Sequence, residues 1–350
     1  MSLLRIAVAG AGAIGHFHIE QIQASHECQL AAIVDPSPAA VELAARLQVP
    51  LFTSLEALFA EFRPDGVILA TPNALHVPQA FECLAARVPA LIEKPLAHTL
   101  EEGERLYAAS RAADTPLLVG HHRAHSPILA QARQVIADGL LGNLVAVMGT
   151  ALFYKPDEYF AAGPWRTQVG GGPILLNLIH EIGNLRSLCG EIVAVQAMAS
   201  HATRGFEVED TVAISLRFAS GALGSFLLSD TAASPRSWEQ TSQENKTYSH
   251  YDDEDCYVIT GTFGQLSVPT MRLKRYGSPE DRSWWKPFIS EQLRQDRADP
   301  LARQLAHFCQ VIRGQAQPLV SVRDGLQNLR VVEAIAQACN SHEQVDVRQD

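Results

Sequence analysis

The sequence lacks the features of a disulfide-stabilised, membrane-spanning or nucleic-acid-binding protein. Its six cysteines are scattered and form no C-x-x-C pair, which predicts buried thiols and no disulfide framework. No apolar run reaches the roughly 18 residues that cross a bilayer, and no signal peptide is evident. Acidic residues outnumber basic ones by 38 to 28, which argues against nucleic acid and membranes as main partners. We therefore expect a cytoplasmic protein.

The length of 350 residues predicts two domains, since an ordinary domain holds roughly 100–200 residues. The first third alternates short β-branched runs with helical patterns, which predicts a doubly wound parallel sheet with helices on both faces. The expected strands are Leu4–Ala9, Leu30–Val34, Gly66–Ala70, Ala90–Glu93 and Leu117–Gly120. The expected helices are Gly15–Ala24, Ala39–Leu47, Val77–Ala86 and Leu100–Ala113.

The pattern changes after about residue 125 and predicts a mostly antiparallel sheet covered by helices. The helices are expected at Pro127–Asp138, Gly170–Cys189, Pro300–Arg313 and Arg323–Asn340. The strands are expected at Val145–Tyr154, Val193–His201, Val212–Phe218, Ala222–Ser229, Tyr257–Thr260, Leu266–Pro269 and Arg272–Tyr276. We expect a first domain over 1–123 and a second over 124–350, whose closing helices can pack back on the first.

A glycine-rich motif follows the first expected strand and opens the first helix. Gly10-Ala-Gly12-Ala13-Ile14-Gly15 fits G-x-G-x-x-G, and Asp35 ends the next strand 20 positions after Gly15. The first glycine permits a tight turn, the second lets the backbone approach a pyrophosphate, and the third lets helix and strand pack closely. Asp35 can accept hydrogen bonds from ribose hydroxyls and would repel a 2′-phosphate. The motif therefore predicts NAD binding, with NADP less favoured; a glycine-rich turn without a nucleotide is the alternative.

Further motifs lie at the ends of expected strands, where open α/β sheets bind ligands. Three motifs follow strands there: Thr71-Pro72-Asn73-x-x-His76, Glu93-Lys94-Pro95 and Gly120-His121-His122-Arg123. Trp165-Arg166 comes next along the chain, and then a Gly170-Gly-Gly run that leads to Asn177 and His180. In this order, together with the glycine motif, the sequence resembles the glucose–fructose oxidoreductase and inositol dehydrogenase family, often called Gfo/Idh/MocA. The resemblance runs over essentially the whole chain.

The resemblance implies a Rossmann domain followed by an α/β domain with an open, mostly antiparallel sheet that often forms the dimer interface. It implies hydride transfer between a nicotinamide and a secondary alcohol or ketone of a sugar, inositol or related polyol, in a homodimer or homotetramer. It also implies a cis peptide bond before Pro95. The cofactor-binding residues would be Gly10, Gly12, Ala13, Ile14, Gly15, Asp35, Thr71, Pro72, Asn73, His76, Glu93 and Lys94.

The sequence departs from this family at the position that often holds an aspartate four residues before the catalytic histidine. Leu176 stands there and cannot exchange protons, while the neighbouring Asn177 can orient a hydroxyl but is no general base. Ala124-His125 also replaces a common Arg-Phe pair. The expected catalytic groups are therefore His180, as the acid or base, and Lys94. The expected substrate-binding residues are Asn177, Arg123, His122, Arg166 and Trp165.

Several of these residues have structural interpretations. His180 can be a core histidine on an apolar helix, Lys94 a surface lysine, and Arg166 a packed, ion-paired residue. His121, His122 and His125 lack the cysteine or acidic partners of a zinc site, so we expect no metal. Trp284-Trp285 can stack on a sugar, although packing is the favoured interpretation. The polar stretch Ser234–Asp255 predicts an exposed loop or hairpin.

Two functions of other classes share these motifs. Some relatives of the family cleave glycosides through transient oxidation by a tightly held NAD, so an NAD-dependent hydrolase is one alternative. A non-catalytic sensor that binds NAD and a partner protein is the other. Free sugar released without net NADH would indicate the hydrolase, and tight NAD binding without turnover would indicate the sensor.

Overall fold

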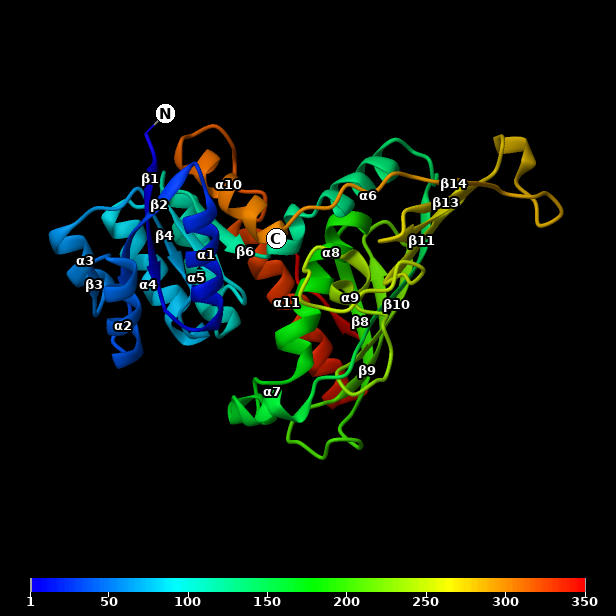
Figure 1. Cartoon of the computed structure of the whole chain (residues 1–350). Helices are drawn as coiled ribbons and strands as arrows, with labels where there is room; N and C mark the ends of the chain where they lie inside the picture. Colours follow the sequence, from blue (N-terminus) through cyan, green and yellow to red (C-terminus); the bar gives the residue numbers. More distant parts are fainter. Residues whose placement is uncertain (1, 350) are drawn as a thin grey trace. The chain divides into compact units, whose positions relative to one another are not determined.

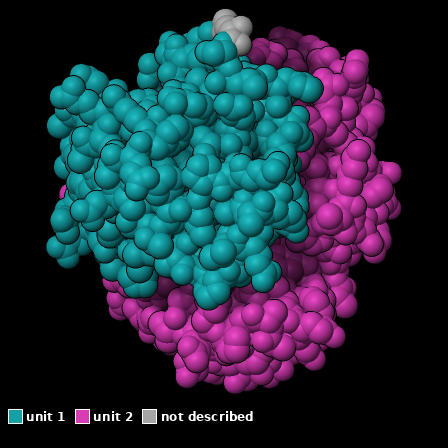
Figure 2. Space-filling view, turned by 60° about the vertical axis from the view of Figure 1, so that its left-hand side comes forward, with its two compact units in different colours: residues 1–125, 300–329 teal, residues 126–299, 330–350 magenta. Residues whose placement is uncertain are grey.

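The computed structural model describes residues 2–349, which divide into two compact units (Figure 2). Unit 1 holds the chain up to His125 together with Pro300–Leu329. Unit 2 holds Ser126–Asp299 and the chain from Arg330 onward. Each unit has its own sheet and its own hydrophobic core.

Unit 1 contains a six-stranded parallel sheet of order β3-β2-β1-β4-β5-β6, connected and covered by helices (Figure 1). The strands are β1 Leu4–Ala9, β2 Cys28–Val34, β3 Leu51–Phe52, β4 Gly66–Leu69, β5 Ala90–Glu93 and β6 Leu117–Gly120. The helices are α1 Ala13–Ala24, α2 Pro38–Leu47, α3 Leu55–Glu61, α4 Asn73–Ala86, α5 Leu100–Ala112 and α10 Pro300–Ile312. The predicted doubly wound fold is confirmed, and its strand order reverses between β1 and β4, where such sheets bind ligands.

Unit 2 contains a nine-stranded sheet of order β14-β13-β12-β11-β7-β10-β9-β8-β15. The strands are β7 Leu144–Leu152, β8 Ile192–Ser200, β9 Thr211–Phe218, β10 Leu223–Ser229, β11 Tyr257–Gly261, β12 Gly264–Val268, β13 Arg272–Arg275, β14 Ile289–Gln292 and β15 Val345–Asp346. Every neighbouring pair is antiparallel except β7 with β10, so the predicted mostly antiparallel sheet is confirmed.

One face of this sheet packs against helices, as Figure 1 shows for α6, α8 and α11. These are α6 Pro127–Ala137, α8 Ile179–Cys189, which directly follows a π-helical turn at Ile174–Leu178, and the part of α11 (Val322–Ser341) that begins at Arg330. The buried sheet face depends on close fits between strands. A Cβ atom at Gly149 of β7 would lie 2.4 Å from the ring of Phe226 on β10, so only glycine leaves room for that ring.

Two sequence predictions about the second unit are wrong in part. The stretch Ser234–Asp255 was expected to be exposed, yet it begins with helix α9 (Trp238–Ser242), in which Trp238 is 1% exposed. Its polar groups are satisfied internally; for example, the indole of Trp238 donates to Glu244 at 3.1 Å, so polarity did not indicate exposure here. Trp284 and Trp285 were expected to pack, yet they are 87% and 83% exposed in the segment between β13 and β14.

The cysteines follow the prediction more closely. All six are free thiols; five are buried, and Cys339 is half-buried. Among the described residues, no helix is both long and apolar enough to cross a membrane.

Candidate functional site

The glycine loop between β1 and α1 has the shape that its three glycines predict. Gly10 has a positive φ of 90°, and a Cβ there would lie 2.4 Å from the carbonyl oxygen of Ala70. A Cβ at Gly15 would lie 2.0 Å from the carbonyl oxygen of Gly10. Gly12 differs, because a Cβ there would meet nothing within 4 Å. Gly10 and Gly15 therefore close the turn, while Gly12 borders open space at the start of α1, where a dinucleotide pyrophosphate fits.

Asp35, at the end of β2, is bonded to this loop. Its Oδ2 accepts the backbone N–H of Ala11 at 2.7 Å, and its Oδ1 accepts that of Ser37 at 2.8 Å. Although burial opposes the charge, these hydrogen bonds lower the pKa of Asp35, so the carboxylate is ionised at neutral pH. A negative carboxylate beside the glycine loop suits ribose hydroxyls and disfavours a phosphate group.

The segments after β4 and β5 are joined by His76. One ring nitrogen lies 2.7 Å from the carbonyl oxygen of Pro95 and the other 2.9 Å from that of Thr71. Burial lowers the pKa of His76, so the neutral ring donates from one nitrogen at a time. The Lys94–Pro95 peptide bond is cis, as the resemblance implied. His76 is 1% exposed, and its two contacts connect the segment after β4 with the segment after β5 that contains Lys94.

Glu93 forms a buried ion pair that reaches the glycine-loop helix. Its Oε1 lies 2.8 Å from Nε2 of His18 on α1, and its Oε2 accepts the backbone N–H of Lys94 at 3.1 Å. Burial alone would raise the pKa of Glu93, but the hydrogen bond and charge of His18, with smaller effects from His122 and Lys94, lower it to about 2. A Cβ at Gly120 would lie 2.9 Å from this carboxylate, so β6 needs glycine there.

The histidine-rich turn after β6 (His122–His125) lies at the same edge of the sheet. Nε2 of His121 is 3.2 Å from Nδ2 of Asn328, within unit 1. Burial, and then the charge of Arg123, lower the pKa of His122 to about 3, so its ring is neutral. Within residues 2–349 no group of three or more His, Cys, Asp or Glu side chains is arranged to hold a metal ion.

In unit 2, Asn177 and His180 lie in successive turns of one helical segment. Asn177 is half-buried in the π-helical turn, and His180 is 7% exposed in the first turn of α8. π-helical turns are frequent at functional sites because the extra residue displaces the side chains of that turn. Leu176, at the position where the resemblance predicts an aspartate, is an apolar, half-buried side chain.

A lysine that the sequence did not single out contacts Asn177. Nζ of Lys155 donates to Oδ1 of Asn177 at 2.8 Å and lies 3.4 Å from Asp230 Oδ2, while the residue is only 8% exposed. The other oxygen of Asp230 accepts from Arg204 Nε at 3.0 Å. Burial lowers the pKa of Lys155, partly opposed by the charge of Asp230. Unit 2 thus places an ammonium group next to Asn177.

Arg166 lies near Lys155, and the two cations share one aromatic ring. Its guanidinium stands over the ring of Tyr159 at 4.1 Å and over Trp165 at 5.4 Å, and it donates to the carbonyl oxygen of Tyr159 at 2.5 Å. Nζ of Lys155 lies 4.9 Å from the centre of the same Tyr159 ring. Trp165 is 51% exposed.

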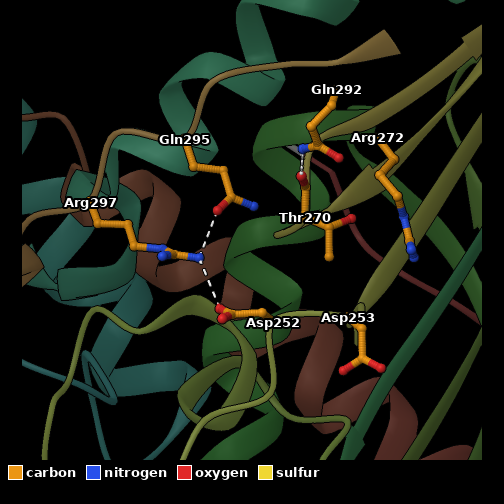
Figure 3. A pocket seen from close by; sticks show the side chains of 7 residues that line it. All are labelled: Asp252, Asp253, Thr270, Arg272, Gln292, Gln295 and Arg297. Atoms are coloured by element: carbon orange, nitrogen blue, oxygen red, sulfur yellow. Dashed lines mark hydrogen bonds and ion pairs between the residues drawn. The ribbon is translucent and has the colours of Figure 1, made fainter. Parts of the chain in front are cut away.

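A cavity of about 390 Å³ also opens in unit 2 (Figure 3). Its side chains bond mainly to one another and to nearby backbone; Arg297, for example, contacts Asp252 and Gln295. None of the residues predicted from the sequence line it. The lining residues are Asp252, Asp253, Thr270, Arg272, Gln292, Gln295 and Arg297.

Each unit therefore gathers a group of predicted residues, and each adds residues that sequence reasoning missed. Unit 1 adds His18, for which a signal existed: it shares the buried face of α1 with Gly15, Ile19 and Ile22, and a buried histidine needs a polar partner. Unit 2 adds Lys155, for which no sequence signal existed, because Asp230 lies 75 positions further along the chain.

Comparison with known proteins gives consistent matches to both units. Residues 4–121 match the oxidoreductase family GFO/IDH/MocA with its NAD-binding Rossmann fold, and residues 129–267 match the GFO/IDH/MocA C-terminal domain. The 1,5-anhydro-D-fructose reductase of Ensifer adhaerens is 28% identical over 297 residues, covering 84% of this chain and 83% of that protein. The 2,7-anhydro-N-acetylneuraminate hydratase of Escherichia coli (strain K12) is 26% identical over 227 residues, covering 63% and 60%.

A solved structure agrees over the full length. The WlbA dehydrogenase of Bordetella pertussis, in complex with NADH and UDP-GlcNAcA, superposes with a TM-score of 0.79 at 25% identity and covers 100% of both chains.

The glycine loop predicts different outcomes for two otherwise identical substitutions. Gly15→Ala forces a Cβ against a backbone oxygen, so we expect the free energy of unfolding to fall by roughly 1–3 kcal/mol. Gly12→Ala meets no atom, so stability should change by less than about 1 kcal/mol, while NAD affinity falls roughly tenfold or more through lost phosphate contacts. Urea unfolding and calorimetric NAD titration measure the two effects. Equal stability losses in both variants would contradict this account of the loop.

Glu93 predicts a pH-dependent contribution to stability. Because folding lowers its pKa from 4.5 to about 2, the carboxylate stabilises the fold above about pH 4.5, and this contribution is lost as the pH falls toward 2. Between about pH 6 and pH 3 the wild type should therefore lose roughly 2 kcal/mol more unfolding free energy than Glu93→Gln. Urea titrations at each pH measure this, with the exposed Glu101→Gln as control. The same pH dependence in the wild type and Glu93→Gln would rule out the ion pair as its source.

Proposed function

The chain belongs to the GFO/IDH/MocA family of oxidoreductases, and we propose that it transfers a hydride between NAD and a secondary alcohol or ketone of a sugar, inositol or related polyol. Unit 1 would be the nucleotide-binding domain, and unit 2 the substrate and oligomerisation domain. The observation that carries the proposal is the position of Lys94, directly after β5 and two strands from the glycine loop. Glu93 accepts the backbone N–H of Lys94, and His76 contacts the carbonyl oxygen of the following Pro95, so the backbone is held on both sides.

The residues of unit 1 fit the cofactor. The open space at Gly12 and the start of α1 would receive the pyrophosphate, and Ala13 and Ile14 follow in that first turn. Asp35 would accept the ribose hydroxyls. The other predicted cofactor residues at the ends of β4 and β5 are Thr71, Pro72 and Asn73, together with His76, Glu93 and Lys94. When bound, the nicotinamide supplies the hydride acceptor or donor.

The chain's own residues would handle the proton and the charge of this reaction. We assign His180 the role of accepting the hydroxyl proton during oxidation, since an imidazole changes charge near neutral pH. The ammonium group of Lys94 would stabilise the negative charge that develops on the substrate oxygen. Asn177, oriented by its hydrogen bond from Lys155, would fix a neighbouring hydroxyl. His122, Arg123, Trp165 and Arg166 remain candidates for substrate contact.

A homo-oligomer through the sheet of unit 2 is also proposed. The face of this sheet turned away from the helices carries exposed apolar side chains, and such patches are typical of protein interfaces. They are Met148 on β7, Met198 on β8, and Leu223 and Leu227 on β10, between 46% and 71% exposed.

The first experiment is NADH formation with a panel of inositols, aldoses and cyclic polyols. We expect one panel member to reduce NAD, and NAD to bind more tightly than NADP because of Asp35. Lys94→Ala and His180→Ala should each lower kcat/KM by roughly 10²–10⁴-fold. The exposed Lys246→Ala and His250→Ala serve as matched controls.

The other outcomes of this experiment separate the alternatives. Release of free sugar from an aryl glycoside without net NADH would replace the dehydrogenase by an NAD-dependent hydrolase. Tight NAD binding with no turnover of any compound would favour a sensor. Absence of nucleotide binding would refute the proposal as a whole.

The proposed interface gives a separate test by light scattering after size-exclusion chromatography. Leu223→Asp with Leu227→Asp should dissociate the oligomer, because two charges would be buried in an apolar contact. Leu319→Asp, at a similarly exposed leucine of unit 1, should leave the mass unchanged. A wild-type protein that is monomeric would disprove the proposal.

A further inference from the structure

Arg166 is a half-buried cation whose charge is not neutralised by an acidic side chain. It lies in the 3-10 turn Pro164–Thr167, and its guanidinium makes one hydrogen bond, to the carbonyl oxygen of Tyr159. Within residues 2–349, no carboxylate lies at ion-pair distance from it. The guanidinium stacks on Tyr159 and Trp165, which fixes its plane and leaves further N–H donors for a ligand.

Lys155 adds a second positive charge close by. Its ammonium group and the guanidinium of Arg166 contact the same Tyr159 ring, 4.9 Å and 4.1 Å from its centre. Lys155 also donates to Asn177, which is proposed to orient a substrate hydroxyl. The two cations and the amide therefore belong to one cluster of unit 2.

The carboxylates near this cluster contact groups other than the guanidinium of Arg166. Asp230 is shared between Lys155 and Arg204, with Nε of Arg204 at 3.0 Å. Glu209 accepts the backbone N–H of Ile174 at 2.8 Å, and burial raises its pKa.

Two further acids, Asp210 and Asp157, contact Arg204. Asp210 accepts the backbone N–H groups of Thr203 and Arg204. Asp157 is exposed and lies 3.8 Å from Arg204. Arg166 is thus the cation of this region that a ligand can pair with.

We propose that Arg166, supported by Lys155, binds a carboxylate of the substrate, so that the substrate is a sugar acid or polyol acid. This proposal rests on the function proposed above and names the substrate class of that site. A planar guanidinium matches the two oxygens of a carboxylate and can form two parallel hydrogen bonds with it. A neutral sugar offers only hydroxyl groups, which make weaker hydrogen bonds to a guanidinium than a carboxylate does.

The test uses matched pairs of compounds that differ by one carboxylate. D-Glucuronate is compared with D-glucose, and D-gluconate with D-glucitol, each in the presence of NAD. Both kcat/KM for NADH formation and the ligand-induced rise in melting temperature are measured. We expect the acid of at least one pair to be favoured roughly 10-fold to 100-fold, less so at high salt.

Variants of Arg166 and Lys155 show whether these residues cause the preference for the acids. Arg166→Gln should abolish it, because kcat/KM for the acid falls much further than kcat/KM for its neutral partner, whereas a structural role would lower both equally. Arg166→Lys keeps the charge without the planar fork and should give an intermediate preference. Lys155→Met should weaken the preference, and Arg275→Gln, an ion-paired arginine of β13, should not.

Other outcomes would contradict the carboxylate proposal or separate it from the proposed function. Equal use of acid and neutral members, or equal losses for both in Arg166→Gln, would overturn the carboxylate proposal while leaving the oxidoreductase intact. A preference for D-glucose 6-phosphate over both acids would replace the carboxylate by a phosphate ester. If NADH forms with no compound, the proposed function fails; the carboxylate site then stands only if the acids still raise the melting temperature of the wild type and not of Arg166→Gln.

Discussion

The buried ion pair between His18 and Glu93 is the interaction on which the proposed chemistry of unit 1 depends. It joins the helix that begins at the glycine loop to the strand that ends at Lys94, and its second carboxylate oxygen accepts the N–H of that lysine. The two side chains are 2% and 4% exposed, so each depends on the other for a polar contact inside the protein. Any change that removes one of them leaves the other buried without its partner. The position of Lys94 is therefore linked to the structure that receives the cofactor.

Unit 2 supplies a different kind of environment. Where many family members have an aspartate before the catalytic histidine, this chain has Leu176, and an ammonium group from a distant loop bonds to the neighbouring Asn177. Asp230 pairs with both Lys155 and Arg204, so these three side chains keep a net positive charge in a largely buried region. A site that presents cations favours anionic ligands, which is the basis of the substrate class proposed above.

Much of the fold could be predicted from the sequence because it depends on local periodicity and on glycine chemistry. The bounds of β1, β5 and β6 agree with the expected strands at both ends. Short elements with weak patterns, such as β3, α3 and α7 (Asp157–Ala161), were missed because a few residues carry little periodicity. Helix α9 was missed because its polar side chains are buried with partners, and pairing cannot be seen in composition.

The sequence by itself determined the dinucleotide fold and the position of Lys94 at a strand end, since these depend on residues close together in the chain. Only the tertiary structure decided which side chains meet across long separations: His18 with Glu93, and Lys155 with Asn177 and Asp230. It also decided that Trp284 and Trp285 are exposed. The physical reason is that burial and ion pairing depend on packing between distant segments, whereas turns and strand ends are set by neighbours in the sequence.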